Sequence, residues 1–308
     1  MPTVTLEAHA KVNLALSVGA PVPPDGYHPI ASWMAPITLH DTVRVEPLPA
    51  GAQSSYDLAW ADDAPRPSPI DWPLERDLAV RAHRLLELAC AQRPRSLPAR
   101  VSVRKRVPVG GGLGGGSADA AAALLALDAA FELGLGSGDL AALGLRLGSD
   151  VPFFLDGPHR PPRPALVGGL GEAVERLEHL PGQMCLVLPP FGCPTGEVYR
   201  ALDAGRGQPG GHADADRVRA LAGGSRRAGR LPDRGLFNDL EAPACAVRPQ
   251  LGALLAALRG AGVLAMVTGS GSTVICPHAA QGQVRSALAG AHGDAAVLAV
   301  ELAEPGAP

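Results

Sequence analysis

The stretch Pro108-Val109-Gly110-Gly111-Gly112-Leu113-Gly114-Gly115-Gly116-Ser117-Ala118-Asp119, followed by the run 120–127, decides how the chain is organised. Six glycines in seven residues cannot form a packed helix or strand, because each costs backbone entropy and brings no side chain to bury. The alanine- and leucine-rich run after them is strongly helix-forming. A glycine-rich loop before a helix lets backbone N–H groups approach a phosphate, and the helix dipole adds about half a positive charge there. We therefore interpret the stretch as a phosphate-binding loop.

Other loop types share some of these features. Gly110, Gly112 and Gly115 form a GxGxxG pattern, which alone is a weak sign of dinucleotide binding. A Rossmann unit also needs an acidic residue about 20 positions on, at the end of a second strand, and that distance falls at Asp128 inside the expected helix. A Walker loop is excluded because no Gly-Lys-Ser/Thr ends the run. A flexible linker would not usually have a proline before it and a strong helix after it, and a dinucleotide-dependent oxidoreductase stays a distant alternative.

The composition limits the possible partners. Of the 308 residues 46% are hydrophobic and 19% charged, as in a globular protein, and the net charge of −3 gives no support for binding nucleic acid or a membrane surface. The five cysteines are scattered without a CxxC pair, so we expect neither a disulfide framework nor a zinc site. Residues 1–20 lack the basic head and apolar core of a signal peptide, and no run approaches the about 18 apolar residues of a membrane span. We expect a cytoplasmic protein, a monomer or weak homodimer, with no nucleic-acid or membrane partner.

Periodicity predicts strands and helices in alternation. The expected strands are 3–8, 12–18, 37–46, 56–60, 99–107, 184–188, 263–267, 274–276 and 295–301. The expected helices are 74–92, 117–133, 137–147 with Ser137 as its cap, 195–202 with Thr195 as its cap, two within 238–260 broken near Pro249, and 280–289. Residues 148–155 are expected to turn into a short apolar strand, and the low-complexity segment 204–235 to be an exposed, partly mobile excursion.

Several polar side chains outside the loop are candidates for chemistry. Lys11 and Lys105 are the only lysines in an arginine-rich chain, which makes each worth attention. Asp150, in a Gly-Ser-Asp-Val-Pro turn, is either a local hydrogen-bond acceptor or a partly buried general base. Lys11 is either a strand-edge lysine or a partner that keeps such a base ionised near a transferring phosphoryl group. Tyr27-His28 suits a flat heterocycle, and a second small-residue loop at 268–272 is either a tight turn or a surface that lets something approach the first loop.

The loop from Pro108 to Asp119 resembles the phosphate-binding loop of the GHMP kinases, which include galactokinase and the homoserine, mevalonate and phosphomevalonate kinases. Further segments lie in that family's order over nearly the whole chain. They are Ala10-Lys11-Val12-Asn13-Leu14, Asp25-Gly26-Tyr27-His28, Gly148 to Phe154, Gly169-Leu170-Gly171-Glu172, Asn238-Asp239-Leu240-Glu241 and Gly269 to Thr273. The Asp-Gly-Tyr-His segment is typical of a branch whose substrate carries a cytidine.

The resemblance implies an α+β fold with an ATP-binding GHMP N-terminal domain over residues 1–160 and a smaller α+β substrate-binding C-terminal domain over residues 161–308. It implies that ATP, with Mg²⁺ bridging its phosphates, meets a cytidine diphosphate substrate in the cleft between them. The implied reaction is phosphorylation of the 2-hydroxyl of a diphosphocytidyl methylerythritol, a step of non-mevalonate isoprenoid synthesis. Another GHMP kinase acting on homoserine or a mevalonate derivative, and a non-catalytic nucleotide-binding module, are the alternatives.

The same resemblance implies a role for individual residues. Asp150 would be the base at the substrate and Lys11 its electrostatic partner, while Asn13 would position the reacting groups. The cytidine would be held by Tyr27, His28, Leu170 and Tyr199, with Thr195 nearby. The ATP phosphates would contact Pro108, Gly110, Gly111, Gly112, Leu113, Gly114, Gly115, Gly116 and Ser117, and Ser117 is a candidate magnesium ligand.

The chain departs from the family pattern at four places, one of which is the segment 158–164, which carries extra residues before Gly169. Ala118 replaces a second serine in the loop, which removes one possible hydroxyl contact to phosphate. Pro29-Ile30 replaces the usual Glu-Leu after His28. Tyr199 stands where a phenylalanine is common, so stacking is kept and a hydroxyl is added.

Overall fold

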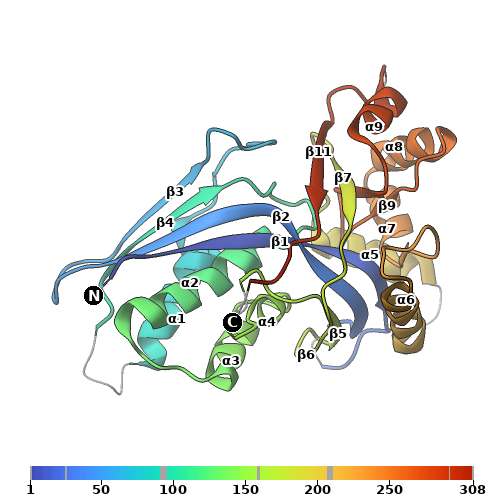
Figure 1. The fold of residues 1–308 in the computed structure, drawn as a ribbon. Coiled ribbons are helices and arrows are strands. Elements are labelled where there is room, and N and C mark those ends of the chain that lie inside the picture. The colour runs from blue at the N-terminus through green and yellow to red at the C-terminus, as the bar shows by residue number, and fades with distance from the viewer. Residues whose placement is uncertain are drawn as a thin grey trace.

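Two β-sheets share one core, and helices cover the outer face of each sheet in the computed structural model (Figure 1). The structure describes residues 2–24, 26–90, 96–157, 160–206, 211–290 and 292–306. The larger sheet has the order β3-β4-β2-β1-β8, with β5 paired to β2 and β6 to β5. Its strands are β1 (Val4–Val18), β2 (Ile30–Pro47), β3 (Ser55–Trp60), β4 (Ala99–Lys105), β5 (Ala165–Gly169), β6 (Ala173–Arg176) and β8 (Phe237–Asn238).

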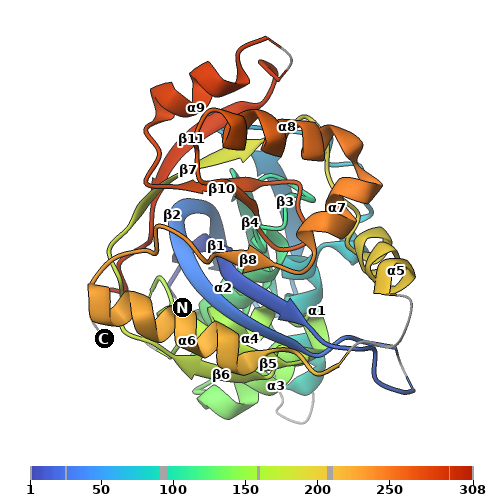
Figure 2. The same cartoon turned by 90° about the vertical axis from the view of Figure 1, so that its right-hand side faces the viewer.

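The second sheet has the order β11-β7-β10-β9 and stands beside the first (Figure 2). Its strands are β7 (Gln183–Leu188), β9 (Met266–Val267), β10 (Val274–Pro277) and β11 (Ala296–Glu301). The helices after β7 are α5 (Thr195–Arg206), α6 (Ala215–Ala228), α7 (Glu241–Val247), α8 (Pro249–Gly260) and α9 (Gln281–Leu288), of which α6 packs on the larger sheet. No helix in the described part of the chain is long and apolar enough to cross a membrane.

The helices α1 (Leu78–Ala89), α2 (Gly115–Phe131), α3 (Ser137–Leu147) and α4 (Val151–Phe154) cover one face of the larger sheet (Figure 1). Helix α2 lies at their centre and is apolar on almost every side, as expected for a helix surrounded by protein. Its many alanines allow close approach to α1 and to the sheet. The glycine-rich loop, residues 108–114, joins β4 to this buried helix, so its position is fixed by the core.

Strand β1 is one continuous strand, although the pattern predicted two strands separated near Lys11. Its exposure alternates only as far as Glu7, and from Ala8 onward both faces are buried, one of them against the second sheet. Continuous burial removes the alternation that marks a strand in a sequence. Register shifts between His9 and Lys11 and between Asn13 and Ala15 place bulges at the polar residues.

Other expected elements also differ from the structure. Residues 151–154 form helix α4 and not a strand, because Pro152 fits the first turn of a helix. The expected helix 74–92 is a 3₁₀ turn, Leu74–Arg76, followed by α1, and Asp77 caps α1 by accepting the N–H groups of Ala79 and Val80. Residues 91–95, at the end of that prediction, lie outside the described residues.

Part of the segment 204–235, expected to be an exposed excursion, is helix α6. Its Val218 and Ala222 are buried against the larger sheet, so the expectation was wrong for this part, while residues 207–210 lie outside the described residues. Helix α3 begins at Ser137 as expected, but Gly136 is its cap and donates to Asp139. The expected boundary near residue 160 stays a prediction, and the β5–β6 hairpin that follows it belongs to the larger sheet.

Candidate active site

The glycine-rich loop is held between the two halves of the molecule. Gly110, Gly112 and Gly114 have φ angles of 71°, 76° and 71°, a conformation that side-chain-bearing residues rarely adopt. The carbonyl oxygens of Gly110, Gly111 and Leu113 accept hydrogen bonds from the backbone N–H groups of Cys193 (3.3 Å), Thr273 (3.2 Å) and Lys11 (2.9 Å). These bonds use carbonyl oxygens of the loop, so they do not compete with its N–H groups for an anion bound at the start of α2.

A second loop, residues 268–273, packs directly on the first. A Cβ atom on Gly112 would lie 2.4 Å from the carbonyl oxygen of Thr268, and one on Gly269 would lie 2.7 Å from that of Gly112. Backbone therefore meets backbone with no room for a side chain. The segment 268–272 is a tight turn between β9 and β10, since the N–H of Gly271 donates to the carbonyl oxygen of Thr268 (3.0 Å), and it also packs against the first loop.

Lys11, Asn13 and Asp150 form a polar group beside the loop. The Lys11 ammonium donates to Asn13 Oδ1 (2.6 Å) and lies 3.4 Å from Asp150 Oδ2. Asn13 is held from two sides, because its side chain donates to Ser32 Oγ (2.8 Å) and its N–H donates to Thr268 Oγ1 (2.7 Å). Lys11 is 4% exposed, whereas the Asp150 side chain is 27% exposed and faces a cavity. A fixed cation therefore lies beside a carboxylate that a ligand can reach.

Aromatic and histidine side chains gather at another part of the same cavity. His28 donates through Nδ1 to the carbonyl oxygen of Gly19 (2.9 Å), and its Nε2 lies 3.4 Å from Asp203 Oδ2. The rings of His28 and Tyr199 are 5.1 Å apart and tilted by 43°. Burial, with a further contribution from Asp150, raises the pKa of the Tyr199 hydroxyl to about 12, so that group stays protonated at neutral pH. Tyr27 is 65% exposed and projects at the cavity edge.

All the residues predicted for the site line one cavity of about 830 Å³. Leu170, 41% exposed, is at its rim, and Thr195 bonds to Ser270 Oγ (2.9 Å) beside it. The neighbour Asp25 of the Asp-Gly-Tyr-His segment lies outside the described residues. Within the described ranges no group of three or more His, Cys, Asp or Glu side chains is arranged to hold a metal ion.

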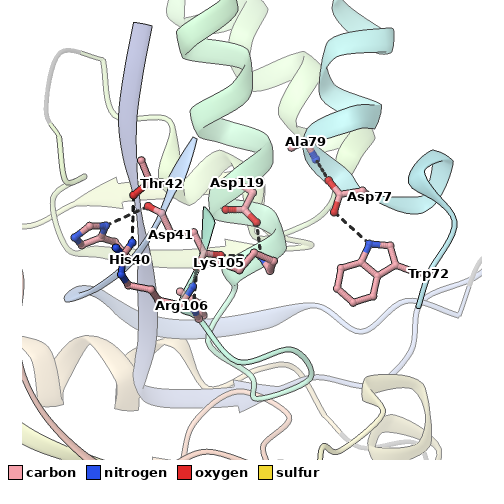
Figure 3. A network of polar contacts seen from close by, with 10 residues as sticks. His40, Asp41, Thr42, Trp72, Asp77, Ala79, Lys105, Arg106 and Asp119 are labelled. Carbon is pink, nitrogen blue, oxygen red and sulfur yellow. Dashed lines mark hydrogen bonds and ion pairs between the residues drawn. The ribbon is translucent and has the colours of Figure 1, made fainter. Parts of the chain in front are cut away.

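Sequence reasoning missed several residues of this cavity. Trp72 donates from Nε1 to Asp77 Oδ2 (3.2 Å), and both lie with Lys105 at the wall nearest α1 and α2 (Figure 3). An aspartate directly before an apolar helix is a recognisable cap, and Lys105 stood out as one of two lysines, so both could have been noticed. Nothing in the local sequence marks Trp72 or Asp203 as part of a site.

Comparisons with known proteins agree with this geometry. Residues 77–158 match the family model for the GHMP kinases N terminal domain. A mevalonate kinase from L. major in complex with R-mevalonate has a TM-score of 0.65 at 16% identity, covering 100% of this chain and 98% of that one, which establishes a common fold. The fold and its glycine-rich loop thus define the class, the GHMP kinases.

Nearer relatives narrow the class. A 4-diphosphocytidyl-2-C-methyl-D-erythritol kinase from Kineococcus radiotolerans is 40% identical over 279 residues, 89% of this chain and 81% of the relative. One from Anaeromyxobacter sp. (strain K) is 40% identical over 303 residues, 96% and 87% of the two chains. A crystal structure of 4-(cytidine 5'-diphospho)-2C-methyl-D-erythritol kinase has 32% identity and a TM-score of 0.70, with 99% and 100% coverage. This chain belongs to the family of 4-diphosphocytidyl-2-C-methyl-D-erythritol kinases.

Proposed function

We propose that this protein transfers the γ-phosphoryl group of ATP to the 2-hydroxyl of 4-diphosphocytidyl-2-C-methyl-D-erythritol, a step of non-mevalonate isoprenoid precursor synthesis. Family membership supports the reaction class. The observation that carries the proposal is that the Lys11–Asp150 pair lies in the same cavity as the glycine-rich loop and the His28–Tyr199 rings. A phosphate-binding element, a reacting pair and a base-binding element therefore meet in one place.

The reaction is a direct in-line transfer. A bond forms between the substrate hydroxyl oxygen and the γ-phosphorus, the bond from that phosphorus to the ADP oxygen breaks, and Asp150 takes the hydroxyl proton. Lys11, held by Asn13 and 3.4 Å from Asp150, places a positive charge beside the carboxylate and neutralises charge on the phosphoryl group. In a loose transition state, this positioning and neutralisation contribute more than proton removal does.

The donor side is formed by the loop and the start of α2. The N–H groups of residues 110–116 receive the phosphates at the positive end of a 17-residue helix. Mg²⁺ in phosphoryl-transfer sites is usually held by one or two protein oxygens together with substrate phosphates. The Ser117 hydroxyl lines the cavity at the start of α2 and would be the protein oxygen that holds the ion, which would supply charge neutralisation when bound.

The acceptor side reads the cytidine. His28 and Tyr199 offer a ring pair for stacking, with Tyr27 at the cavity edge and Leu170 at its rim. Nδ1 of His28 donates to Gly19 and its Nε2 lies 3.4 Å from Asp203 Oδ2, so the imidazole is held at both nitrogens and contributes its ring face to the base-binding element. The residue set is that of a nucleotide-linked substrate, and a small polyol or amino acid would leave the rings without a partner.

The deciding experiment is an assay that couples ADP release to a measurable signal, with the diphosphocytidyl substrate, mevalonate and homoserine compared at equal concentration. We expect turnover only with the diphosphocytidyl substrate. Faster turnover of mevalonate or homoserine would show that the alcohol substrate is not the diphosphocytidyl compound. ATP binding without alcohol-dependent ADP release would indicate a non-catalytic nucleotide-binding protein.

A further inference from the structure

A buried group of three ionisable side chains, Asp41, Lys105 and Asp119, lies at the base of the glycine-rich loop (Figure 3). The Lys105 ammonium donates to Asp41 Oδ2 (2.7 Å) and to Asp119 Oδ2 (2.6 Å). Lys105 is 4% exposed, Asp41 0% and Asp119 2%. Burial opposes the charge on Lys105, but Asp119 and Asp41 outweigh it and hold its pKa above the usual value, so the lysine remains a cation.

The three residues come from three elements that meet at this point. Asp41 is in β2, Lys105 ends β4 directly before the loop, and Asp119 is in the second turn of α2 directly after it. The other oxygen of Asp41 accepts the backbone N–H groups of Arg106 and Val107 (2.7 Å to the latter). The chain is thus tied to β2 as it enters the loop and to the same cluster as it leaves.

The entrance and exit of the loop are in contact at the cluster. A Cβ atom on Gly115 would lie 2.8 Å from Val107 Cγ1 and 3.7 Å from Asp41 Oδ2. We call Val107 and Gly115, which face each other there, the neck of the loop. A shift of β4 or of α2 at the neck would change the spacing of the N–H groups in the loop that joins them.

Stability alone does not account for such a cluster. Burying three ionisable groups is costly, and burial raises the pKa of the Asp119 carboxyl to about 8 although Lys105 lies beside it. Well-packed apolar side chains of similar volume often replace a buried ion pair without loss of stability. Apolar side chains could not accept the two backbone N–H groups at the loop entrance, nor could they set a fixed distance between β2, β4 and α2. The cluster therefore differs from an apolar core in one respect, the fixed arrangement of β2, β4 and α2 that it imposes.

We propose that Asp41, Lys105 and Asp119 are positioning residues of the nucleotide site, which hold the neck closed and so keep the loop in the shape that receives the ATP triphosphate. They act through the backbone of the loop. The inference rests on the proposed function, because it assigns the loop to ATP. Substitutions in the cluster should therefore lower the affinity for ATP and leave the affinity for the alcohol substrate unchanged.

The test measures binding of the β,γ-imido analogue of ATP by calorimetry, together with KM for each substrate. Asp119→Ala removes the tie on the helix side, and we expect the analogue to bind at least about tenfold more weakly, since small displacements of positioning groups are costly. Asp119→Asn keeps an oxygen that can accept from Lys105, and we expect it to restore affinity to within about threefold of wild type. KM for the diphosphocytidyl substrate should stay within about twofold in both.

Asp156→Ala is the matched control. Asp156 is a buried carboxylate, 6% exposed, paired with Arg163 and Arg176 away from the cavity. Its loss should lower the melting temperature as Asp119→Ala does, yet leave the analogue affinity unchanged. Equal affinity of wild type and Asp119→Ala for the analogue would overturn the proposal, as would an equal loss of affinity in the control.

Asp41→Asn gives a second test in case Asp119→Ala does not fold. Its amide oxygen can still accept from the loop entrance, but its NH₂ group would face the Lys105 ammonium. We expect weaker analogue binding with an unchanged circular dichroism spectrum, and wild-type affinity in this folded variant would overturn the proposal. Wild-type protein that binds the analogue but does not phosphorylate the diphosphocytidyl substrate would refute the proposed function and leave this inference standing.

Discussion

Lys11 and Asp150 are single residues whose substitution should change turnover much more than binding. Asp150→Asn removes the proton acceptor, and Lys11→Met removes the cation while keeping most of the buried stem. General-base help is worth about 10² to 10⁴ in rate, so we expect kcat to fall by about that factor, with KM for both substrates changed only a few-fold. Steady-state kinetics on the folded variants measures this, and near-normal kcat in either would remove that residue from the mechanism.

His28 should act on one substrate only. His28→Ala removes the ring beside Tyr199 and its hydrogen bond to the carbonyl oxygen of Gly19, both at the part of the cavity assigned to the cytidine. We expect KM for the diphosphocytidyl substrate to rise at least about tenfold, the scale of a lost stacking and hydrogen-bonding partner, and KM for ATP to stay nearly constant. An equal rise of both KM values would argue against a contact between His28 and the cytidine.

Some residues of the site could be predicted from the sequence and others could not. Lys11, Asn13, His28 and the glycines could be assigned because they lie in short segments that resemble those of known kinases. Asp203 could not, because its relation to His28 exists only once α5 is packed beside the turn at 26–29. A lone aspartate in a polar helix has no local pattern that distinguishes it from a solvated one.

At the scale of elements, the contact between the two loops makes a sharp prediction. Gly112→Ala would place a methyl group 2.4 Å from the Thr268 carbonyl oxygen at a φ of 76°, so the two loops must move apart. We expect a lower melting temperature and a higher KM for ATP. Both are measured directly, by thermal unfolding and by kinetics.

Gly138→Ala is the control for that change. Gly138 lies in α3 with open space where its Cβ would be, and alanine is favoured over glycine in a helix by about 0.5–1 kcal/mol. The control should be as stable as wild type or more so, with unchanged KM. If Gly112→Ala behaved like Gly138→Ala, the contact between the loops would not constrain the nucleotide site.

Helix α1 contains a buried histidine that should make stability depend on pH. His83 lies between the hydroxyl of Tyr56 (3.0 Å) and the carbonyl oxygen of Leu97 (2.8 Å), with Glu87 and Arg84 nearby. Burial lowers its pKa below the ordinary 6.5, so just below that pH the unfolded chain binds more protons than the folded one. Its stabilising effect is present above pH 6.5 and is lost as the pH falls toward the folded pKa.

We therefore expect the melting temperature to fall between about pH 7.5 and pH 5, and to fall less in His83→Gln. Some dependence should remain, because burial also lowers the pKa of His9. Parallel curves for the variant and the wild type would show that His83 does not titrate with unfolding.

Element types were predictable where the local pattern and the packing agree. The strand–loop–helix unit around the glycines was correct because glycines and alanines dictate it locally. Helix α4 was taken for a strand, since four apolar residues fit either element when both faces are buried. Helix α6 was missed because a few apolar residues, among them Val218 and Ala222, give a weak helical pattern in a segment of low complexity.

At the scale of the whole molecule, the shared core predicts how the protein unfolds. One buried cluster takes Val12 and Leu14 from β1 together with Leu186 from β7 and Val300 from β11. Neither half can bury these side chains alone. We expect one calorimetric transition, with equal calorimetric and van't Hoff enthalpies, and no stable fold for a fragment ending near residue 160. Two separate transitions would support independent domains.

The contact between the two small-residue loops could not be predicted from the sequence. The segments 108–114 and 268–273 are each recognisable as small-residue loops, but their contact depends on how the second sheet packs on the first. The same holds for the bond between the N–H of Asn13 and Thr268. Long-range packing of this kind leaves no periodic trace in either segment.

The attachment of the glycine-rich loop has a practical consequence for ligand discovery. Three of its carbonyl oxygens are bound to other parts of the protein, and Gly112 rests on the opposite loop. A loop held in this way should keep one shape in the empty and the occupied enzyme. Compounds selected against the free protein should therefore meet the same anion-binding surface that operates during turnover, and fragments carrying a phosphate mimic are the natural first library to screen.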